Sequence, residues 1–377
     1  SSDLPLEMEQ IENSSVTAEL PREPMGSIPN EASTGAASGG AASDDSMVRV
    51  SIQLEKAPTI DAGFEIKHIA QNAKAMRYRD SLKQTQDQLQ ATIERQALHG
   101  QRLDVVWNLT LAANLISANV EYGEIAAIRQ VPGVEQVILE TQYAPAVVDV
   151  DLPDDPNMST SSSMIGSNAA WAAGYTGAGS RIAVIDTGID TDHQSFDAGA
   201  FDYSLEEQAS NAGKTVADYH LLNPAEINRV MDQLHVTGVT SDQLYVNSKI
   251  PFGYNYVDDD LDITHDNDTQ GEHGSHVEGI AAANAYIPDG NGGYDHAIPS
   301  VFVQGVAPDA QIIAMKVFGK NGGAYESDYM VAMEDAIVLG CDAVNLSLGA
   351  PNPGNTRHEE SIYQAILDKL GILRGGA

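Results

Sequence analysis

The second half of this chain alternates strand-like and helix-like runs, and this pattern restricts the fold more than any other feature. The segments RIAVIDTGI (181–189) and AQIIAMKVFG (310–319) are apolar and are bounded by turn-forming residues, as buried strands are. ESDYMVAMEDAIVLG (326–340) has the length of a helix, and CDAVNLSLG (341–349) follows it as another strand. Strands joined through helices predict an α/β fold, with a mostly parallel sheet covered by helices on both faces. Functional sites in such sheets lie at the carboxyl ends of the strands.

The region before this half has a different pattern. Residues 47–144 contain an alternating strand (VRVSIQL), a helical stretch without Gly or Pro (64–99), two further strands, a short helix and a last strand. The order β-α-β-β-α-β predicts a small α+β domain of the ferredoxin-like type, with helices on one face of a four-stranded sheet.

Low-complexity stretches mark the domain boundaries. Residues 1–46 are rich in Ser, Ala, Gly, Pro and Glu, and we expect them to form a disordered tail. Residues 145–163 are rich in Pro, Asp and Ser and are expected to form a linker. A second domain is then predicted over 164–377, beginning with a helix in MIGSNAAWAAGY.

Composition excludes several functional classes. The chain has 54 acidic and 20 basic residues and a formal net charge of −34, and such a surface repels nucleic acid and anionic membranes. No run approaches the ~20 apolar residues of a membrane span. The first residues show neither the basic start nor the apolar run of a signal peptide. The single cysteine, Cys341, allows no intramolecular disulfide, and its apolar surroundings predict a buried, inert thiol.

Two residues can supply acid–base chemistry. Asp186 ends the strand IAVID, which places its carboxylate at the carboxyl edge of the predicted sheet, although a turn-capping role explains the same residue. His273 begins the Ala- and Gly-rich stretch HGSHVEGIAAAN, a predicted tightly packed helix. A strand-end carboxylate that orients a helix-start imidazole is half of a relay in which the imidazole takes a proton from a hydroxyl nucleophile.

Metal binding by His273 and His276 is the alternative for the same stretch. The helical zinc signature H-E-x-x-H places its ligands four residues apart, whereas these histidines are three apart and Glu278 follows both. The run DNDTQG (266–271) starts like a calcium loop, but Val277 stands where an EF-hand needs its bidentate glutamate. The spacing therefore favours the acid–base relay and identifies no metal ligands.

Four segments occur in the order found in the subtilisin-like serine proteases: AVIDTGID, HGSHVEGIAAAN, GVAPDAQIIAMKVFG and DAVNLSLG. The chain resembles this family (the subtilases, peptidase family S8) over about residues 164–370, and is most similar to its large secreted, cell-envelope members in Gram-positive bacteria. The resemblance implies that Asp186 orients the general base His273, with His276 a packed helix residue. It also implies that two segments form opposite walls of a substrate groove, namely Ser347, Leu348 and Gly349 on one side and Gly322 and Gly323 on the other.

The resemblance extends to the first domain. Residues 47–144 are similar to the inhibitory (inhibitor I9-like) propeptide of the family, which implies a folding template and intramolecular inhibitor that is cut off somewhere in 143–163. Substrates would be proteins or peptides, and no cofactor is required for the chemistry. The resemblance allows structural calcium, and the Asp-rich loops 258–268 and 289–295 are either its sites or solvated turns. A secreted or cell-envelope location in a bacterium is expected.

One expected part is missing from the sequence. The family's nucleophile lies in a segment of the form G-T-S-x-A-x-P, and none occurs in these 377 residues. The oxyanion-hole asparagine should follow SIYQAILDKL, where the chain instead reads GILRGGA. Losing one such donor costs about 3 kcal/mol of transition-state stabilisation. We therefore expect a truncated precursor of a serine endopeptidase that is inactive by itself.

Two other functional classes remain open at this point. One is a non-catalytic subtilase relative that uses the groove only to bind peptides, and the other is a metallohydrolase that uses His273 and His276. Ser347 is not promoted to nucleophile, because a strand serine with a structural hydroxyl explains it equally well.

Overall fold

The computed structural model describes residues 43–66, 68–145, 158–266 and 268–349. The predicted tail lies outside these residues except for Ser43–Ser46, which form a turn before the first strand. Most of the predicted linker (146–157) and the last part of the chain (350–377) also lie outside the described residues.

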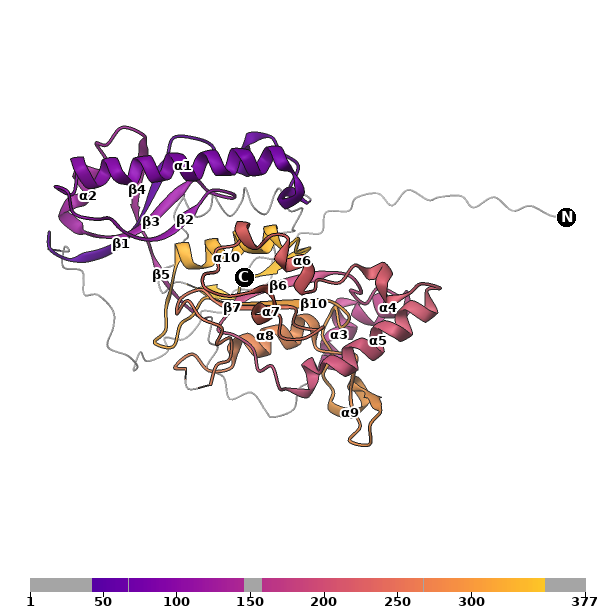
Figure 1. Cartoon of the computed structure of the whole chain (residues 1–377). Coiled ribbons are helices and arrows are strands. Elements are labelled where there is room, and N and C mark those ends of the chain that lie inside the picture. The colour runs from indigo at the N-terminus through magenta and orange to yellow at the C-terminus, as the bar shows by residue number, and fades with distance from the viewer. Residues whose placement is uncertain (1–42, 67, 146–157, 267, 350–377) are drawn as a thin grey trace, which may run out of the picture. The chain divides into compact units, whose positions relative to one another are not determined.

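The first domain is a four-stranded antiparallel sheet with helices on one face (Figure 1). Its strands are β1 (Met47–Leu54), β2 (Asp104–Leu109), β3 (Leu115–Glu121) and β4 (Val134–Leu139), in the spatial order β2-β3-β1-β4. The helices are α1 (Ala73–Gln96) and α2 (Ile125–Ile128), with short 3-10 turns at Thr59–Ala62, Ile69–Gln71 and Tyr122–Glu124. The element order is the predicted β-α-β-β-α-β, so the α+β ferredoxin-like fold is confirmed.

Local signals explain where α1 begins and which face it buries. The side chain of Asn72 accepts hydrogen bonds from the backbone N–H groups of Lys74 and Ala75, which caps the helix after a stretch that the sequence had assigned to helix from residue 64. Leu89 and Ile93 pack into the core with strand residues such as Ile52. The sheet therefore buries one stripe of α1, as the helical period requires.

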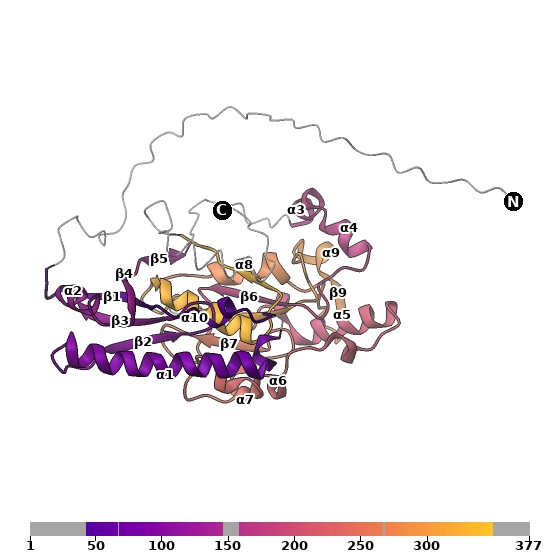
Figure 2. The same ribbon diagram turned by 90° about the horizontal axis from the view of Figure 1, so that it is seen from above.

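The second domain is built on a parallel sheet. Its strands are β6 (Arg181–Asp186), β7 (Phe252–Asn255), β10 (Gln311–Lys316) and β12 (Ala343–Asn345), in the spatial order β12-β6-β10-β7. Helices α8 (His273–Ala282) and α10 (Glu326–Val338) lie on opposite sides of these strands (Figure 1; Figure 2 gives the view from above). The predicted mostly parallel sheet with helices on both faces is confirmed. Asp186 and Lys316 pair in register at the carboxyl ends of their strands.

The remaining elements surround this sheet. They are α3 (Met158–Ile165), α4 (Ser167–Ala172), α5 (Ala198–Asn211), α6 (Pro224–Asn228), α7 (Ser241–Leu244), α9 (Ala297–Val301), β8 (Tyr286–Pro288) and β9 (Tyr294–His296). Short 3-10 turns lie at Gln194–Phe196, Val216–Tyr219 and Met231–Gln233. Three two- to four-residue strands form a separate small sheet, namely β5 (Gln142–Pro145), β11 (Ala324–Tyr325) and β13 (Leu348–Gly349).

One boundary differs from its prediction. Helix α3 begins at Met158, inside the range 145–163 assigned to the linker, and MIGSNAAWAAGY is divided between α3 and α4 rather than forming one helix. Gly166 separates the two helices with φ 84°, a left-handed conformation that a glycine adopts without strain. Within the described residues, no helix is both long enough and apolar enough to cross a membrane.

Candidate active site

Asp186 lies where the sequence predicted it, at the end of β6. The residue is 1% exposed, and its Oδ1 accepts a hydrogen bond of 2.7 Å from the backbone N–H of Thr187. The chain then turns at Gly188, whose φ of 110° and close approach to the carbonyl of Ile263 leave no room for a side chain. A buried carboxylate is thus aimed out of the carboxyl end of the sheet, as expected for a functional group in an α/β fold.

His273 is the first residue of α8 and meets this carboxylate. Its Nδ1 lies 2.7 Å from Asp186 Oδ1, and the imidazole side chain is 18% exposed against 2% for the aspartate. An ionised carboxylate oxygen can only accept a hydrogen bond, so Nδ1–H is the donor. This fixes the tautomer in which Nε2 is the atom able to accept a proton, the arrangement that a general base needs.

Backbone packing sets the distance between the two residues. Gly274 N–H donates to Thr187 Oγ1 at 2.8 Å, and a Cβ at Gly274 would lie 2.2 Å from the carbonyl oxygen of Gly188. Ser275 Oγ accepts a hydrogen bond of 2.7 Å from the backbone N–H of Asp190. The first turn of α8 can therefore approach the end of β6 only because residue 274 has no side chain.

A buried positive charge stands close to this turn. Lys316, at the end of β10, donates to the carbonyl oxygens of Thr187 (2.6 Å) and Thr264 (3.0 Å) and forms an ion pair with Asp268. The side chain is nearly fully buried. It ties the loop before α8 to the turn after β6, the two segments that carry His273 and Asp186.

A second carboxyl group near Asp186 was not anticipated. Glu278 lies one turn beyond Gly274 on the same face of α8 and is 1% exposed. Burial first, and then the charge of Asp186, raise the pKa of Glu278 well above its usual value, which favours the protonated, neutral form of this side chain. Neither Asp186 Oδ2 nor Glu278 Oε2 has a hydrogen-bond partner among the described residues. The one sequence signal for a buried Glu278 was its position four residues after Gly274, which places both residues on the same face of α8.

The prediction that His276 is a packed helix residue is wrong, because the structure leaves His276 exposed. The buried positions of α8 are Gly274, Glu278 and Ala282, and residue 276 faces the other side of a helix with that period. His273 and His276 therefore do not converge on one site. Across the described ranges, no group of three or more His, Cys, Asp or Glu side chains is arranged to hold a metal ion.

The Asp-rich loops use their carboxylates as turn caps. Asp289 Oδ1 accepts hydrogen bonds from the backbone N–H groups of Asn291 (2.7 Å) and Gly293 (2.9 Å), and these bonds lower the pKa of Asp289. In the other loop, Asp260 Oδ1 accepts from the backbone N–H of Asp262 at 2.9 Å. These contacts fit solvated turns better than a calcium cage, which needs six to eight oxygen ligands directed at one point.

The five residues predicted to form groove walls flank a strand from the first domain. β5 pairs antiparallel with β11 on one side (Ala324 with Tyr143) and with β13 on the other (Leu348 with Pro145 and Gly349 with Ala144). Gly322 and Gly323 precede β11 with φ of 85° and 80°, and a Cβ at Gly323 would lie 2.2 Å from Gln142 Nε2. The segments that the sequence assigned to the two walls therefore lie on either side of a bound extended segment.

Ser347 and Cys341 were considered as nucleophiles, and neither is arranged for attack. Ser347 Oγ donates to Asn345 Oδ1 at 2.9 Å, which gives this hydroxyl a structural partner. Burial raises the pKa of Cys341 to about 12, so its thiol stays protonated and unreactive.

Helix α10 makes several contacts between the two domains that sequence reasoning missed. Glu334 is fully buried, and its Oε1 accepts hydrogen bonds from the backbone N–H groups of Leu111 (2.8 Å) and Ala112 (2.7 Å) in the turn between β2 and β3. Arg79 of α1 lies 3.5 Å from Glu334 Oε2. A glutamate inside an apolar helix was the available signal, because such a residue is almost never fully buried unless it is paired.

The contacts at the other end of α10 involve its first turn. Trp107 Nε1 donates to Asp328 Oδ1 at 2.8 Å, and the Ser327 hydroxyl donates to Glu140 Oε2 at 2.8 Å. Burial raises the pKa of both carboxyl groups. Both ends of α10 are therefore joined to the first domain by buried polar contacts.

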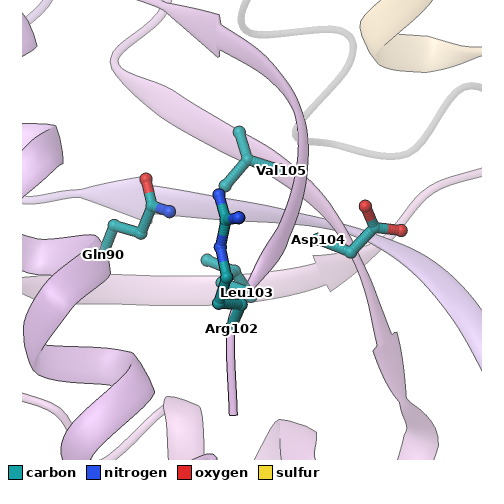
Figure 3. A pocket seen from close by; sticks show the side chains of 5 residues that line it. All are labelled: Gln90, Arg102, Leu103, Asp104 and Val105. Carbon is teal, nitrogen blue, oxygen red and sulfur yellow. The ribbon is translucent and has the colours of Figure 1, made fainter. Parts of the chain in front are cut away.

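The first domain also contains a pocket (Figure 3). Its lining contains Gln90, Arg102, Leu103, Asp104 and Val105. Asp104 points away from Gln90 in the figure, and its Oδ2 accepts a hydrogen bond from Asn119 at 2.8 Å. Asp104 is the one carboxylate of this lining, and the pocket is formed by first-domain residues, so it adds nothing to the chemistry of Asp186 and His273.

Comparisons with known proteins found one family match and several relatives of this chain. A sequence profile of the subtilase family matches residues 177–374. The chain is 28% identical over 329 residues to the PI-type proteinase of Lactococcus lactis subsp. cremoris, an alignment that covers 85% of this chain and 15% of that protein. It is 30% identical over 209 residues to the minor extracellular protease Vpr of Bacillus subtilis (strain 168), with 53% of this chain and 18% of that protein covered.

Among solved structures, the epidermin leader peptide processing serine protease of Staphylococcus aureus matches at a TM-score of 0.41 and 14% identity, covering 87% of this chain and 57% of that one. The chain thus spans only a small part, 15–18%, of the length of the two curated relatives.

Proposed function

This chain belongs to the subtilase family, and from that premise we propose that it supplies two members of the relay of a serine endopeptidase. Asp186 is the orienting acid and His273 the general base. The observation that carries the proposal is the 2.7 Å hydrogen bond between His273 Nδ1 and Asp186 Oδ1. The substrates would be proteins or peptides.

The proposed reaction uses a serine that is absent from residues 1–377. His273 Nε2 takes the proton of the serine hydroxyl while the serine oxygen attacks the peptide carbonyl. The carboxylate of Asp186 stabilises the imidazolium that forms, and the imidazolium then protonates the leaving amine. Water repeats the sequence to release the acyl group. The 377-residue chain by itself is accordingly proposed to be inactive.

The first domain is proposed to be the intramolecular inhibitor of this enzyme. Support comes from β5, which pairs with both β11 and β13, the segments proposed to bind substrate backbones as an added strand. Tyr143 of β5 is 5% exposed, and its ring meets Tyr329 edge-on at 5.5 Å. A segment held this way blocks the groove until it is cut, and we propose cleavage within 143–163.

Location, cofactors and structural calcium complete the proposal. A secreted or cell-envelope location in a bacterium is proposed from the relatives, one of which is named as extracellular. No cofactor enters the proposed chemistry. Structural calcium is proposed from the family resemblance alone. If calcium binds, the melting temperature should rise when millimolar calcium is added and fall again when a chelator removes it.

A serine-directed fluorophosphonate tests the proposal directly. A longer chain that carries a G-T-S-x-A-x-P segment should be labelled on that serine and should cleave peptides, whereas His273→Ala should lose both properties. The 377-residue chain should remain unlabelled. Activity that is abolished by a chelator and unaffected by the fluorophosphonate would instead support a metallohydrolase. Peptide binding without labelling or cleavage would support a non-catalytic relative.

A further inference from the structure

The insert between β6 and β7 contacts the first domain at a short segment, residues 233–235, which we call the clasp. Arg79 Nη1 donates to the carbonyl oxygen of Gln233 at 2.8 Å, and Gln233 Nε2 donates to the carbonyl oxygen of Ala70 at 3.3 Å. His235 Nε2 lies 3.1 Å from the carbonyl oxygen of Asn108. The clasp therefore holds two separate parts of the first domain, α1 with the turn before it and the end of β2.

The same segment is attached to helix α10. The backbone N–H of His235 lies 3.1 Å from Asp335 Oδ1 and 3.0 Å from Oδ2, and its Nδ1 lies 2.7 Å from Oδ1. Asp335 also accepts a hydrogen bond of 2.9 Å from the hydroxyl of Tyr256. Burial first, and then Asp335, raise the pKa of Tyr256 well above its usual value, so this phenol remains a donor. Asp335 therefore accepts hydrogen bonds from the backbone N–H and the ring of His235 and from the hydroxyl of Tyr256.

The two ring nitrogens of His235 both face acceptors. A carboxylate oxygen and a backbone carbonyl oxygen have no hydrogen to donate. A neutral imidazole carries one N–H and can satisfy only one of these oxygens, whereas the doubly protonated ring satisfies both. Glu334 Oε2, 3.7 Å from Nε2, adds a second negative group beside the ring. The side chain is 12% exposed, so water is largely excluded from the contact.

We propose that residues 233–235 are a docking surface for this chain's own first domain, and that the contact is tightest when His235 is doubly protonated. Protonation of the ring and docking of the domain favour each other, so docking strengthens as pH falls and weakens as pH rises. Neutralising the ring keeps the shorter bond to Asp335 and loses the donor to Asn108. The first domain is the partner that loses a contact.

Other charged groups surround this contact and are part of the same electrostatic environment. They are Arg79 and Lys83 on α1, Asp232 in the insert, Glu334 and Asp335 on α10, and Tyr256 after β7. Burial lowers the pKa of Lys83, with Arg79 acting in the same direction and the acidic groups opposing it. Imidazole is the group in this set whose ordinary titration falls between pH 5 and 8.

Hydrogen exchange measures the docking without any need for protease activity. The backbone N–H groups of Leu111 and Ala112 donate to Glu334 on α10, so their protection reports contact between the domains. The 377-residue chain and its His235→Gln variant are compared at pH 6 and at pH 8. Taking the ratio of rates at one pH removes the base-catalysed part of exchange.

We expect these amides to exchange on the order of tenfold faster in His235→Gln at pH 6, because a hydrogen bond from a charged donor is lost. At pH 8 the ratio should be smaller than at pH 6, because the contribution of the ring proton to docking decreases as pH rises. A ratio of one at both values would overturn the docking role of His235. A raised ratio that does not change with pH would overturn its dependence on protonation.

His99→Asn is the matched control. His99 is exposed, lies in the first domain, and has a φ of 52° that asparagine tolerates, so this variant should change neither ratio. Amides of β10 serve as the check that each variant is folded. If His235→Gln fails that check, the unaltered chain still decides the matter. Protection at residues 111 and 112 must then fall relative to β10 as pH rises, and a constant ratio refutes the proposal.

The proposal that residues 233–235 hold the first domain does not depend on the proposed function. What this contact would do in a protease precursor does rest on the proposed function. If the chain is the precursor of a protease, release of the inhibitory domain is favoured by rising pH. Failure of a serine-containing chain to cleave peptides would remove that consequence and leave the exchange result intact. Failure of the exchange test would leave the proposed relay of Asp186 and His273 untouched.

Discussion

Asp186 has a different environment at each of its two carboxylate oxygens. Oδ1 accepts from Thr187 N–H and from His273, whereas Oδ2 is buried without a hydrogen-bond partner in the described part of the chain. Both of these hydrogen bonds to the carboxylate are therefore made by the same oxygen, and the imidazole is its one side-chain partner in the described part of the chain. This makes the pair sensitive to any change that alters the acceptor.

Replacing Asp186 with asparagine tests the orienting role. The amide cannot hold the imidazole in the tautomer described above, so kcat of a serine-containing chain should fall by about 10⁴ with little change in KM. Steady-state kinetics on a peptide substrate measure both values. Asp295→Asn, which changes an exposed carboxylate on β9, is the control and should leave kcat unchanged. An effect confined to KM would contradict the assignment.

We expect the buried carboxyl group of Glu278 to lower the free energy of unfolding as pH rises. Its pKa is raised in the folded protein, so folding favours the protonated form, and that contribution is complete below the pKa of the unfolded chain. As pH rises above that value, the unfolded state gains by ionising and stability is lost. Glu278→Gln cannot ionise, so its melting temperature should rise relative to the unaltered protein between pH 5 and pH 8.

Thermal unfolding at a series of pH values measures this difference. Glu206→Gln, at an exposed position of α5, is the matched control and should show a flat difference. If Glu278→Gln gives the same shift in melting temperature at pH 5 and pH 8, the carboxyl group does not titrate as described.

At the scale of elements, the approach of α8 to β6 depends on one missing side chain. A Cβ at Gly274 would meet the backbone of Gly188, whereas nothing lies within 4 Å of a Cβ at Gly279 in the same helix. Gly279→Ala should stabilise the protein by roughly 0.5–1 kcal/mol, because alanine favours the helix more than glycine does. Gly274→Ala should destabilise it instead, by about 1–3 kcal/mol as an overpacked contact.

Denaturant unfolding of the two variants gives both free energies, and His273 reports the local effect. Gly274→Ala should lower kcat of a serine-containing chain because α8 is pushed away from Asp186. Equal stability and equal kcat in the two variants would mean that α8 accommodates the added methyl group by moving without consequence.

The buried strands of the parallel sheet were predicted well from the sequence. β6 and β10 are apolar runs of strand length that end at turn residues, and length and flanking residues together distinguish such a run from a buried helix. The break between α3 and α4 was missed because a single Gly166 costs a helix little in sequence terms, and its left-handed backbone decides the outcome. His276 was misplaced because its packed role was taken from the family resemblance, whereas the buried face of α8 contains Gly274, Glu278 and Ala282.

Contacts between distant segments were beyond the reach of pattern reasoning. Glu278 and Glu334 read as ordinary helix residues, and only packing shows that one lies beside Asp186 while the other accepts backbone hydrogen bonds from the turn after β2. His235 is more distant still, since its partner Asn108 is 127 positions away in the chain. The relay residues were found because their neighbours in sequence form recognisable segments, which these three residues lack.

At the scale of the whole molecule, α10 is the element shared by both domains. Every residue from Glu326 to Val338 is buried, with one side in the core of the second domain and polar groups towards the first. A helix that places acidic side chains against another domain would be poorly stable if that domain left. Because α10 carries these acidic side chains, the stability of the second domain should depend on the presence of the first domain.

The pair of Arg79 and Glu334 provides the test of this dependence. Glu334→Gln removes the charge that Arg79 faces at 3.5 Å in a site where the two side chains are 1% and 0% exposed. A buried guanidinium left without its partner should cost about 3–5 kcal/mol of unfolding free energy. Changing both residues, Arg79→Met with Glu334→Gln, removes both charges and should restore most of that loss.

Urea unfolding of the two single variants and the double variant completes a double-mutant cycle. Additive losses in that cycle would show that the two charges do not depend on each other, and that the first domain is held by contacts other than this pair.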